Sequence, residues 1–323
     1  MKAVVYREYG SPEKFQVLEI PKPIPKENEV LIKVHSASIN SWDMDLLKGD
    51  PLSRLIFLGI LKPRHTILGC DIAGRIDAVG ENVTQFKVGD EVYGDISGDG
   101  WGGFAEFVCA AENLITWKPN NLSFEETASL PQAGVLALQG LKYNGEIKQG
   151  QKILINGAGG GVGTIALQIA KLFEAEVTCV DKANKLDFLI SLGANYVINF
   201  EQEDFTRNGH SYDLILDNVA NKSVFDYKRS LTLGGACVIV GGSFKSILQA
   251  ITLGSPISTT NNKKVCILAH RPNQKDLNIL REYFEEERIK PVVDKIFPLS
   301  NTADAFRYFE KGDFKGKVVI SMN

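Results

Sequence analysis

The feature of this sequence with the clearest chemical meaning is a run of glycines at the start of a helical segment. It follows the apolar, β-branched residues 153–155 and reads Ala158-x-Gly160-x-x-Gly163. Gly160 would let the backbone approach a pyrophosphate, Gly163 would let the helix pack close to the strand, and the free N–H groups of the helix start would meet the negative charge. A glycine run alone also fits a flexible loop. The readable strand before it and helix after it favour a dinucleotide-binding turn.

An acidic residue follows at the distance expected of a ribose-binding acid. Asp181 comes directly after a second apolar run, Glu176–Val180, about 20 residues beyond the turn. A carboxylate there would accept hydrogen bonds from a ribose diol and repel a 2′-phosphate, which favours NAD(H). Lys182 and Lys185 could instead pair with that phosphate. Asp181 could also point outward to solvent, so these residues leave the choice of cofactor open.

The elements around this turn alternate between strand and helix. Strands are predicted at Lys152–Asn156, Glu176–Val180, Tyr196–Asn199, Asp213–Asp217, Ala236–Val240 and Lys263–Ala269. Helices are predicted at Gly163–Phe173, Lys185–Leu192 and Ser223–Leu231, and Gly193 stands where a helix C-terminus favours a residue tolerant of left-handed geometry. Alternation with short connections predicts a parallel, doubly wound sheet, so the fold class is α/β.

The first 118 or so residues have a different pattern, with short strands separated by glycine and proline. Strands are predicted at Ala3–Tyr6, Val30–Val34, Gly69–Val79, Glu91–Tyr93 and Phe104–Val108. This pattern indicates a compact, β-rich, barrel-like domain and not a parallel sheet. The segment Leu122–Leu141 is helical and alanine-rich, Gln274–Ile289 is a charged amphipathic helix, and Lys317–Ser321 closes the chain as a strand.

Composition narrows the class of protein. At 323 residues the chain is long enough for two domains, and a net charge of −3 gives no indication of a nucleic-acid partner. The five cysteines are scattered without a C-x-x-C pair, which argues against a disulfide framework or a zinc knuckle and favours a reducing compartment. The first residues lack the apolar core of a signal peptide, and no apolar run reaches the ~18 residues of a membrane span. We therefore expect a cytoplasmic protein.

Several short motifs, in order along the whole chain, carry a family resemblance. They are ASIN-SWD (37–43), GCDIAG (69–74), VGDEVYG (88–94), GGFAEFV (102–108), GAGGGVG (157–163), SLGAN (191–195), YDLILD (212–217) and GKVVI (316–320). The chain resembles the medium-chain dehydrogenases/reductases, in particular their zinc-free, zeta-crystallin-like quinone oxidoreductase branch. The resemblance implies a β-rich GroES-like catalytic domain made of residues 1–120 and 270–323. It also implies a Rossmann nucleotide-binding domain of residues 121–269, and a cleft between the two for nicotinamide and substrate.

The residue types at three positions argue against a catalytic zinc. Zinc-using members of the family have a cysteine where this chain has Asn40–Asp43, a histidine where it has Cys70, and a second cysteine near Gln132–Ala133. Three converging ligands are needed, whereas Cys70 beside Asp71 offers one thiol and one acid. We expect no metal, and the ordinary interpretation of Cys70 is a buried packing residue.

Without a Lewis acid, the expected acceptors are those that take a hydride easily, because conjugation spreads the developing negative charge. The resemblance therefore implies a zinc-independent NAD(P)H-dependent reductase of quinones or α,β-unsaturated carbonyls. Asn40 is the candidate catalytic group beside the nicotinamide, although it could simply be a turn former. Two alternatives stay open: an NAD(P)-dependent alcohol dehydrogenase, and a nucleotide-binding protein with a non-enzymatic role.

The remaining candidate residues follow from the same motifs. The cofactor-binding candidates are Asn40, Ala158, Gly160, Gly161, Val162, Gly163, Asp181, Lys182, Lys185, Asn218, Val219, Gly241, Gly242 and Lys317. The substrate-pocket candidates, each of which could also be ordinary core, are Trp42, Leu47, Trp101 and Leu136, with Leu55 and Ile56. Leu136 stands where relatives usually have Thr, and Ser41-Trp42 replaces a common Asn-Pro-Val-Asp pattern, so we expect an altered pocket shape.

The resemblance also bears on cofactor and assembly. Most relatives of this branch use NADPH, so NADP(H) is the expected cofactor, with NAD(H) left possible by Asp181. The expected substrate is a small hydrophobic carbonyl compound or quinone. A homodimer is expected through the edge of the nucleotide-binding sheet, because the apolar run Val265–Leu268 would otherwise be an exposed edge strand.

Overall fold

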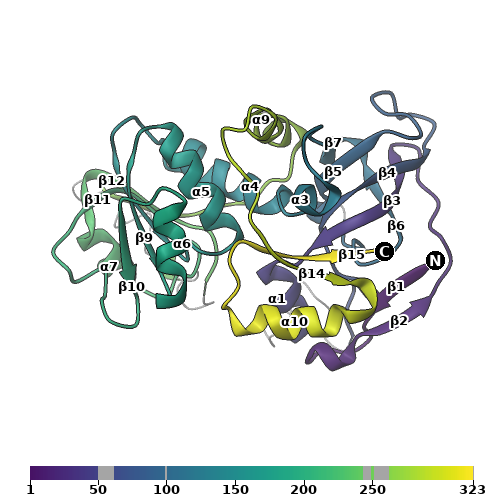
Figure 1. The fold of residues 1–323 in the computed structure, drawn as a ribbon, viewed down its shortest axis with the longest axis horizontal. Helices are drawn as coiled ribbons and strands as arrows, with labels where there is room; N and C mark the ends of the chain where they lie inside the picture. The colour runs from purple at the N-terminus through teal and green to yellow at the C-terminus, as the bar shows by residue number, and fades with distance from the viewer. Residues whose placement is uncertain (50–61, 99, 243–248, 251–261, 323) are drawn as a thin grey trace. The chain divides into compact units, whose positions relative to one another are not determined.

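The computed structural model describes residues 1–49, 62–98, 100–242, 249–250 and 262–322 (Figure 1). The chain divides into two compact units. The first comprises Met1–Gln132, Arg271–Glu287 and Pro291–Asn323, and the second comprises Ala133–His270 and Arg288–Lys290. The boundary between them lies within one helix, twelve residues beyond the position near 120 expected from the sequence. No helix among the described residues is long and apolar enough to cross a membrane.

The second unit contains a parallel sheet of six strands. The strands are β8 (Lys152–Asn156), β9 (Glu176–Asp181), β10 (Tyr196–Asn199), β11 (Tyr212–Asp217), β12 (Leu231–Ile239) and β13 (Lys264–Ile267). Their spatial order is β10-β9-β8-β11-β12-β13, and every pair is parallel. Numbered from the first of these strands, the order is 3-2-1-4-5-6, which is the order of a Rossmann sheet. The predicted α/β doubly wound fold is therefore confirmed.

Helices connect these strands and bury their apolar faces on the sheet. They are α5 (Gly161–Leu172), α6 (Leu186–Ser191) and α7 (Val224–Arg229), preceded in the chain by α4 (Pro131–Leu138). Helix α5 contacts β8 and β9, and α7 contacts β12 and β13. Gly193, after α6, has φ of 111°, as its predicted place at a helix end requires.

The first unit is mainly antiparallel. Its strands are β1 (Lys2–Val5), β2 (Gln16–Glu19), β3 (Glu29–Ser38), β4 (Asp71–Val79), β5 (Glu91–Asp95), β6 (Phe107–Ala111), β7 (Ile115–Trp117), β14 (Val293–Pro298) and β15 (Lys317–Ser321). Strands β1 and β2 pair alone. The others form a sheet in the order β14-β15-β3-β4-β5-β7, with β6 on β3. The C-terminal strand β15 thus pairs with β3 in the β-rich unit.

Four helices belong largely or wholly to this unit: α1 (Ser41–Lys48), α3 (Phe124–Ala128), α9 (Gln274–Glu285) and α10 (Thr302–Lys311). Helix α9 is the predicted amphipathic helix, and it buries Leu277, Leu280 and Phe284. Tyr93 Oη on β5 donates a hydrogen bond to the carbonyl of Leu277 at 2.8 Å, which ties α9 to the sheet.

Some predicted bounds were wrong. The strand predicted at Phe104–Val108 begins later, at Phe107, because Gly102–Phe104 instead donate backbone hydrogen bonds to Leu68 and Gly69. Strand β12 begins at Leu231, where a helix was predicted to end, because α7 already stops at Arg229.

Candidate active site

In the second unit, the glycine turn joins β8 to α5 as predicted. A Cβ atom on Gly163 would lie 2.5 Å from the Cα and carbonyl oxygen of Ala158, so only glycine lets the helix pack this close to the turn. Gly160 differs. It is the N-cap of α5, and the nearest atom to an added Cβ would be the carbonyl oxygen of Gly157 at 3.6 Å. Among the described residues, no atom fills the space where a Cβ of residue 160 would lie.

The other nucleotide-site candidates in this unit lie at the carboxyl ends of neighbouring strands. Asp181 ends β9, Asn218 and Val219 follow β11, and Gly241 and Gly242 follow β12. Because the strands are parallel, these ends share one edge of the sheet with the glycine turn. The strand order reverses between β8 and β11, and ligands of such sheets bind at this point.

Asp181 is engaged by the protein. Its carboxylate accepts hydrogen bonds from the N–H of Gly159 at 2.7 Å and from that of Lys182 at 2.8 Å. Lys185 Nζ lies 3.6 Å from the carboxylate, and both side chains are at least nine-tenths buried. The solvent-facing alternative for Asp181 is therefore wrong, because this carboxylate braces the glycine turn with a lysine beside it.

A network behind the turn was not predicted from the sequence. Asp217, at the end of β11, accepts hydrogen bonds from Asn156 Nδ2 at 2.9 Å and from Tyr227 Oη at 2.7 Å. Asn218 Nδ2 donates to the carbonyl of Asn156 at 2.9 Å. Asn218 Oδ1 is buried without a hydrogen-bond partner in the described part of the chain, so an acceptor at this edge is available to a ligand.

In the first unit, Asn40, Asp71 and Lys317 meet in one buried cluster. Lys317 Nζ donates to Asn40 Oδ1 at 2.6 Å and to Asp71 Oδ2 at 3.0 Å, and Asn40 Nδ2 donates to Asp71 Oδ2 at 2.9 Å. Asn40 is 7% exposed and Lys317 4% exposed. Although Asn40 is the N-cap residue of α1, its side chain faces the acid and the lysine, so it is more than a turn former.

The strand register explains why these residues meet. Ser38 on β3 is opposite both Asp71 on β4 and Val319 on β15. Asn40 follows β3, and Lys317 begins β15, so the ends of three strands deliver the three side chains. Ser38 Oγ also donates to Asp71 Oδ2 at 2.9 Å.

The side chains at the three positions where the resemblance places zinc ligands do lie close together, but hydrogen bonds join them. Cys70 Sγ accepts from Asn40 Nδ2 at 3.5 Å and from Gln132 Nε2 at 3.3 Å. The backbone N–H of Gln132 donates to Asp71 Oδ1 at 2.7 Å. Burial raises the pKa of the Cys70 thiol well above its usual range, and the neighbouring carboxylates act in the same direction. The thiol is therefore held in its neutral form.

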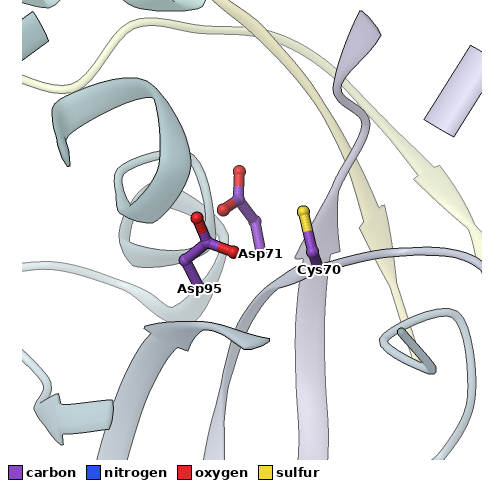
Figure 2. Close-up of side chains that lie close together, drawn as sticks. All are labelled: Cys70, Asp71 and Asp95. Atoms are coloured by element: carbon purple, nitrogen blue, oxygen red, sulfur yellow. The ribbon is translucent and has the colours of Figure 1, made fainter. Parts of the chain in front are cut away.

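Asp95 adds a third potential metal ligand that the sequence analysis did not consider. Figure 2 shows Cys70, Asp71 and Asp95 side by side, with their ligand atoms within 4.8 Å of one another. Asp71 and Asp95 are opposite each other in the register of β4 and β5. However, the Lys317 ammonium already lies against Asp71, and both Asp71 oxygens accept hydrogen bonds. The donor set is poorly suited to a divalent cation, because a positive charge and hydrogen-bond donors already surround it.

Asp43 braces the same region. It accepts hydrogen bonds from the N–H of Asn40 and the N–H of Gly69, each at 2.9 Å, and so ties α1 to the residue before Cys70. Burial raises the pKa of this carboxyl to about 7, against the effect of those two hydrogen bonds. Its role is to hold α1 in place.

The substrate-pocket candidates lie in different surroundings. Trp42 and Trp101 make an edge-to-face contact with ring centroids 5.7 Å apart, and Trp42 is 44% exposed. Leu47 is fully buried in the core of the first unit, whereas Leu136 lies half-buried on α4 in the second unit. Leu55 and Ile56 lie outside the described residues.

Family models match both parts of the chain. The alcohol dehydrogenase GroES-like domain matches residues 26–120, and the zinc-binding dehydrogenase family matches residues 192–320. The name of the second family mentions zinc, whereas the zinc-ligand positions of this chain hold Asn40, Cys70 and Gln132.

Curated relatives and solved structures agree with these matches. The chain is 36% identical to 2-methylene-furan-3-one reductase of Solanum lycopersicum and 33% identical to the chloroplastic NADPH-dependent alkenal/one oxidoreductase of Arabidopsis thaliana. Each alignment covers 99% of this chain and 79% of the relative. The quinone oxidoreductase structure from Coxiella burnetii superposes with a TM-score of 0.88 at 30% identity, over 100% of this chain and 99% of that one. The chain therefore belongs to the medium-chain dehydrogenase/reductase superfamily, in its quinone oxidoreductase branch.

Proposed function

We propose that this chain is a zinc-independent, NADP(H)-dependent reductase of quinones and α,β-unsaturated carbonyl compounds. The carrying observation is the cluster at the zinc-ligand positions, where the side-chain amides of Asn40 and Gln132 donate to Cys70 Sγ and the buried Lys317 donates to Asp71. Such a cluster supplies no Lewis acid for an alcohol or a simple ketone. The relative from Solanum lycopersicum is named a 2-methylene-furan-3-one reductase and that from Arabidopsis thaliana an NADPH-dependent alkenal/one oxidoreductase, which supports the same substrate class.

The second unit fits a dinucleotide. The open space beside Gly160, the N-terminus of α5 and the unpartnered acceptor of Asn218 together suit a pyrophosphate and its sugars. Ala158, Gly161, Val162 and Gly163 complete the turn, and Gly241 and Gly242 lie at the same edge. We propose these residues, with Val219 and Lys182, as the cofactor-binding residues of the second unit, and Lys317 as a cofactor-binding residue of the first.

The surroundings of Asp181 support NADP(H). A bare carboxylate would repel a 2′-phosphate, but two backbone N–H groups and Lys185 largely offset this charge. A 2′-phosphate bound beside the acid would lie close to the ammonium group of Lys185 as well. The named NADPH dependence of the Arabidopsis relative agrees with this choice.

When bound, the dihydronicotinamide supplies a hydride, that is, two electrons, to the β carbon of an enone or to a quinone, and the resulting enolate or hydroquinone anion then takes one proton. Asn40 is the proposed catalytic polar group. Lys317 and Asp71 hold its amide from both ends, so it keeps one orientation without reorganisation. Lys317 thus acts as a positioning residue as well as a cofactor-binding candidate.

A substrate panel tests the function. Oxidation of NADPH and NADH would be followed at 340 nm with 9,10-phenanthrenequinone, but-3-en-2-one and cyclohexanone. We expect turnover of the quinone and the enone with NADPH, and none of the simple ketone. Turnover of cyclohexanone or of primary alcohols at comparable efficiency would contradict the proposal in favour of an alcohol dehydrogenase.

Metal independence is a separate prediction. Because Lys317 already supplies a positive charge against Asp71, we expect kcat to be unchanged after exhaustive dialysis against a chelator. Metal content would be measured by elemental analysis on the same sample. Loss of activity on chelation with recovery on adding Zn²⁺ would show that Cys70, Asp71 and Asp95 hold a metal after all.

A homodimer is proposed through β13, which ends the sheet of the second unit in the described part of the chain. Val265 on β13 and Leu268 directly after it are buried within the unit, whereas Cys266 and Ile267 are partly exposed. An edge strand offers unpaired backbone groups to a second copy of the chain. Light scattering at micromolar concentration should give the mass of a dimer. A monomer under these conditions would contradict the prediction.

The compartment is proposed to be the cytoplasm. All five cysteines are free, and burial raises the thiol pKa of the three on the nucleotide sheet, Cys179, Cys237 and Cys266. Such unpaired thiols are compatible with a reducing environment.

A further inference from the structure

Three aromatic side chains of the first unit gather in one cluster. Trp101, on the loop between β5 and β6, contacts the ring of His65 at a centroid distance of 4.8 Å and that of Trp42 at 5.7 Å. Trp42 lies in the first turn of α1 and is 44% exposed, whereas Trp101 packs partly against the core. His65 was not among the residues predicted from the sequence.

The cluster is anchored beside the Asn40 cluster. Gly102, directly after Trp101, donates its N–H to the carbonyl of Gly69 at 3.1 Å. The N–H of Gly69 in turn donates to Asp43, one residue after Trp42, at 2.9 Å. The residue after each tryptophan is therefore hydrogen-bonded to Gly69, the residue that precedes Cys70.

The indole N–H of Trp101 has no hydrogen-bond partner in the described part of the chain. Trp101 Nε1 is buried, and no hydrogen-bond acceptor among the described residues reaches it. An indole nitrogen is only a donor, and a buried donor left unpaired is destabilising. A ligand carbonyl oxygen would remove this penalty.

The ring of His65 gives the cluster an uncharged wall. Burial lowers the pKa of this imidazole below its usual value, and the nearby Arg64 acts in the same direction. At neutral pH the ring is therefore a neutral, flat surface. A neutral imidazole can pack against an aromatic face without the cost of desolvating a charge.

We propose that Trp42, His65 and Trp101 form a subsite for a flat, conjugated ring ketone, whose carbonyl oxygen accepts a hydrogen bond from Trp101 Nε1. The inference rests on the proposed reductase function and narrows its substrates to quinones and cyclic enones that carry an aromatic face. Aromatic pairs stabilise a complex by more than the apolar area they bury, and a short acyclic alkenone has no aromatic face.

The first test removes only the N–H group. Trp101→Phe keeps an aromatic ring, so kcat/KM for 9,10-phenanthrenequinone should fall about tenfold, the effect of one hydrogen bond of ~1.4 kcal/mol. For but-3-en-2-one, kcat/KM should change less than about twofold. The matched control is Trp117→Phe, because Trp117 is 39% exposed on the same unit and packs on Phe86 away from this cluster. It should leave both values unchanged.

A second test needs no turnover. The chain has three tryptophans, so in the Trp117→Phe protein all tryptophan fluorescence comes from the proposed subsite. Titration with 9,10-phenanthrenequinone, without nucleotide, should quench this emission saturably. The quinone concentration at half-quenching should rise when His65→Ala is added. Linear quenching like that of free N-acetyltryptophanamide would overturn the subsite.

The two tests separate the subsite from the function on which it rests. If the unmodified protein reduces neither the quinone nor the enone, the proposed function is wrong, and saturable quenching still decides the subsite. If the unmodified protein reduces both compounds, and Trp101→Phe has the same kcat/KM for the quinone, the proposed subsite is wrong and the proposed function stands. A thermal melt of Trp101→Phe within about 3 °C of the unmodified protein confirms that the comparison concerns a folded enzyme.

Discussion

Gly160→Val is expected to abolish binding of both NADPH and NADH while leaving a folded protein. The N-cap residue Gly160 has φ of −85° and ψ of −179°, an extended conformation that valine adopts readily. The nearest atom to an added Cβ lies 3.6 Å away, so the protein tolerates the side chain. The valine would occupy the space proposed for the pyrophosphate. Losing two charge-assisted hydrogen bonds of about 1.5–3 kcal/mol each raises Kd at least about a hundredfold.

Gly163→Val is the contrasting variant on the same turn. Its Cβ would lie 2.5 Å from backbone atoms of Ala158 and Gly157, and backbone cannot move aside as a flexible side chain can. We expect a loss of more than about 2 kcal/mol of stability, because overpacking at fixed atoms is costly. Isothermal titration gives Kd for both nucleotides, and circular dichroism gives the melting temperature. Normal nucleotide binding by Gly160→Val would show that the pyrophosphate does not approach this residue.

The nucleotide-binding sheet could be predicted because its signals are local. Each strand is a short apolar run, each helix follows within a few residues, and the turn motif sets the register of Gly160 and Gly163. The structure placed all of the corresponding candidates at one edge of the sheet. The role of Asp181 could not be predicted in the same way, since its contacts with Gly159 and Lys185 depend on how β9 lies against the turn.

The cluster of Asn40, Asp71 and Lys317 could be proposed only in part. The resemblance singled out Asn40 and Lys317, but Asp71 and Lys317 are 246 residues apart, and their contact depends on β3 pairing with both β4 and β15. No local pattern encodes such a pairing. Asp95 was missed for the same reason, because it meets Asp71 through the register of β4 and β5.

Two elements near the C-terminus, one helix and one strand, were not predicted from the sequence. Helix α10 carries Ala305 and Phe306 on its buried side, and Gly312 after it has φ of 68°, the left-handed geometry of a helix end. The apolar residues at this spacing and the glycine after them were visible in the sequence. Strand β14 is harder to predict, because most of its residues are exposed or partly exposed and it pairs in parallel with β15.

Lys185→Ala is expected to shift the choice of cofactor. Lys185 Nζ lies 3.6 Å from the Asp181 carboxylate, both are buried, and the pair sits against Gly159 of the turn. Without the lysine, Asp181 keeps its two backbone hydrogen bonds, but the ammonium group of Lys185 no longer offsets the negative charge of its carboxylate. The carboxylate would then repel a 2′-phosphate more strongly. The phosphate loses a charge-assisted partner of about 1.5–3 kcal/mol, so the ratio of kcat/KM for NADPH to that for NADH should fall about ten- to a hundredfold.

The control for this variant is Lys152→Ala, because Lys152 is exposed at the amino end of β8, the opposite edge of the same sheet. It changes the net charge by the same amount and should leave the ratio unchanged, which separates a local phosphate contact from a general loss of positive charge. Lys185→Arg should keep most of the preference for NADPH, since it retains the charge. Steady-state kinetics with both cofactors on the three variants measure the ratio. An equal fall of NADPH and NADH efficiency in Lys185→Ala would show that this lysine serves only to brace Asp181 and the turn, and that the 2′-phosphate is bound elsewhere.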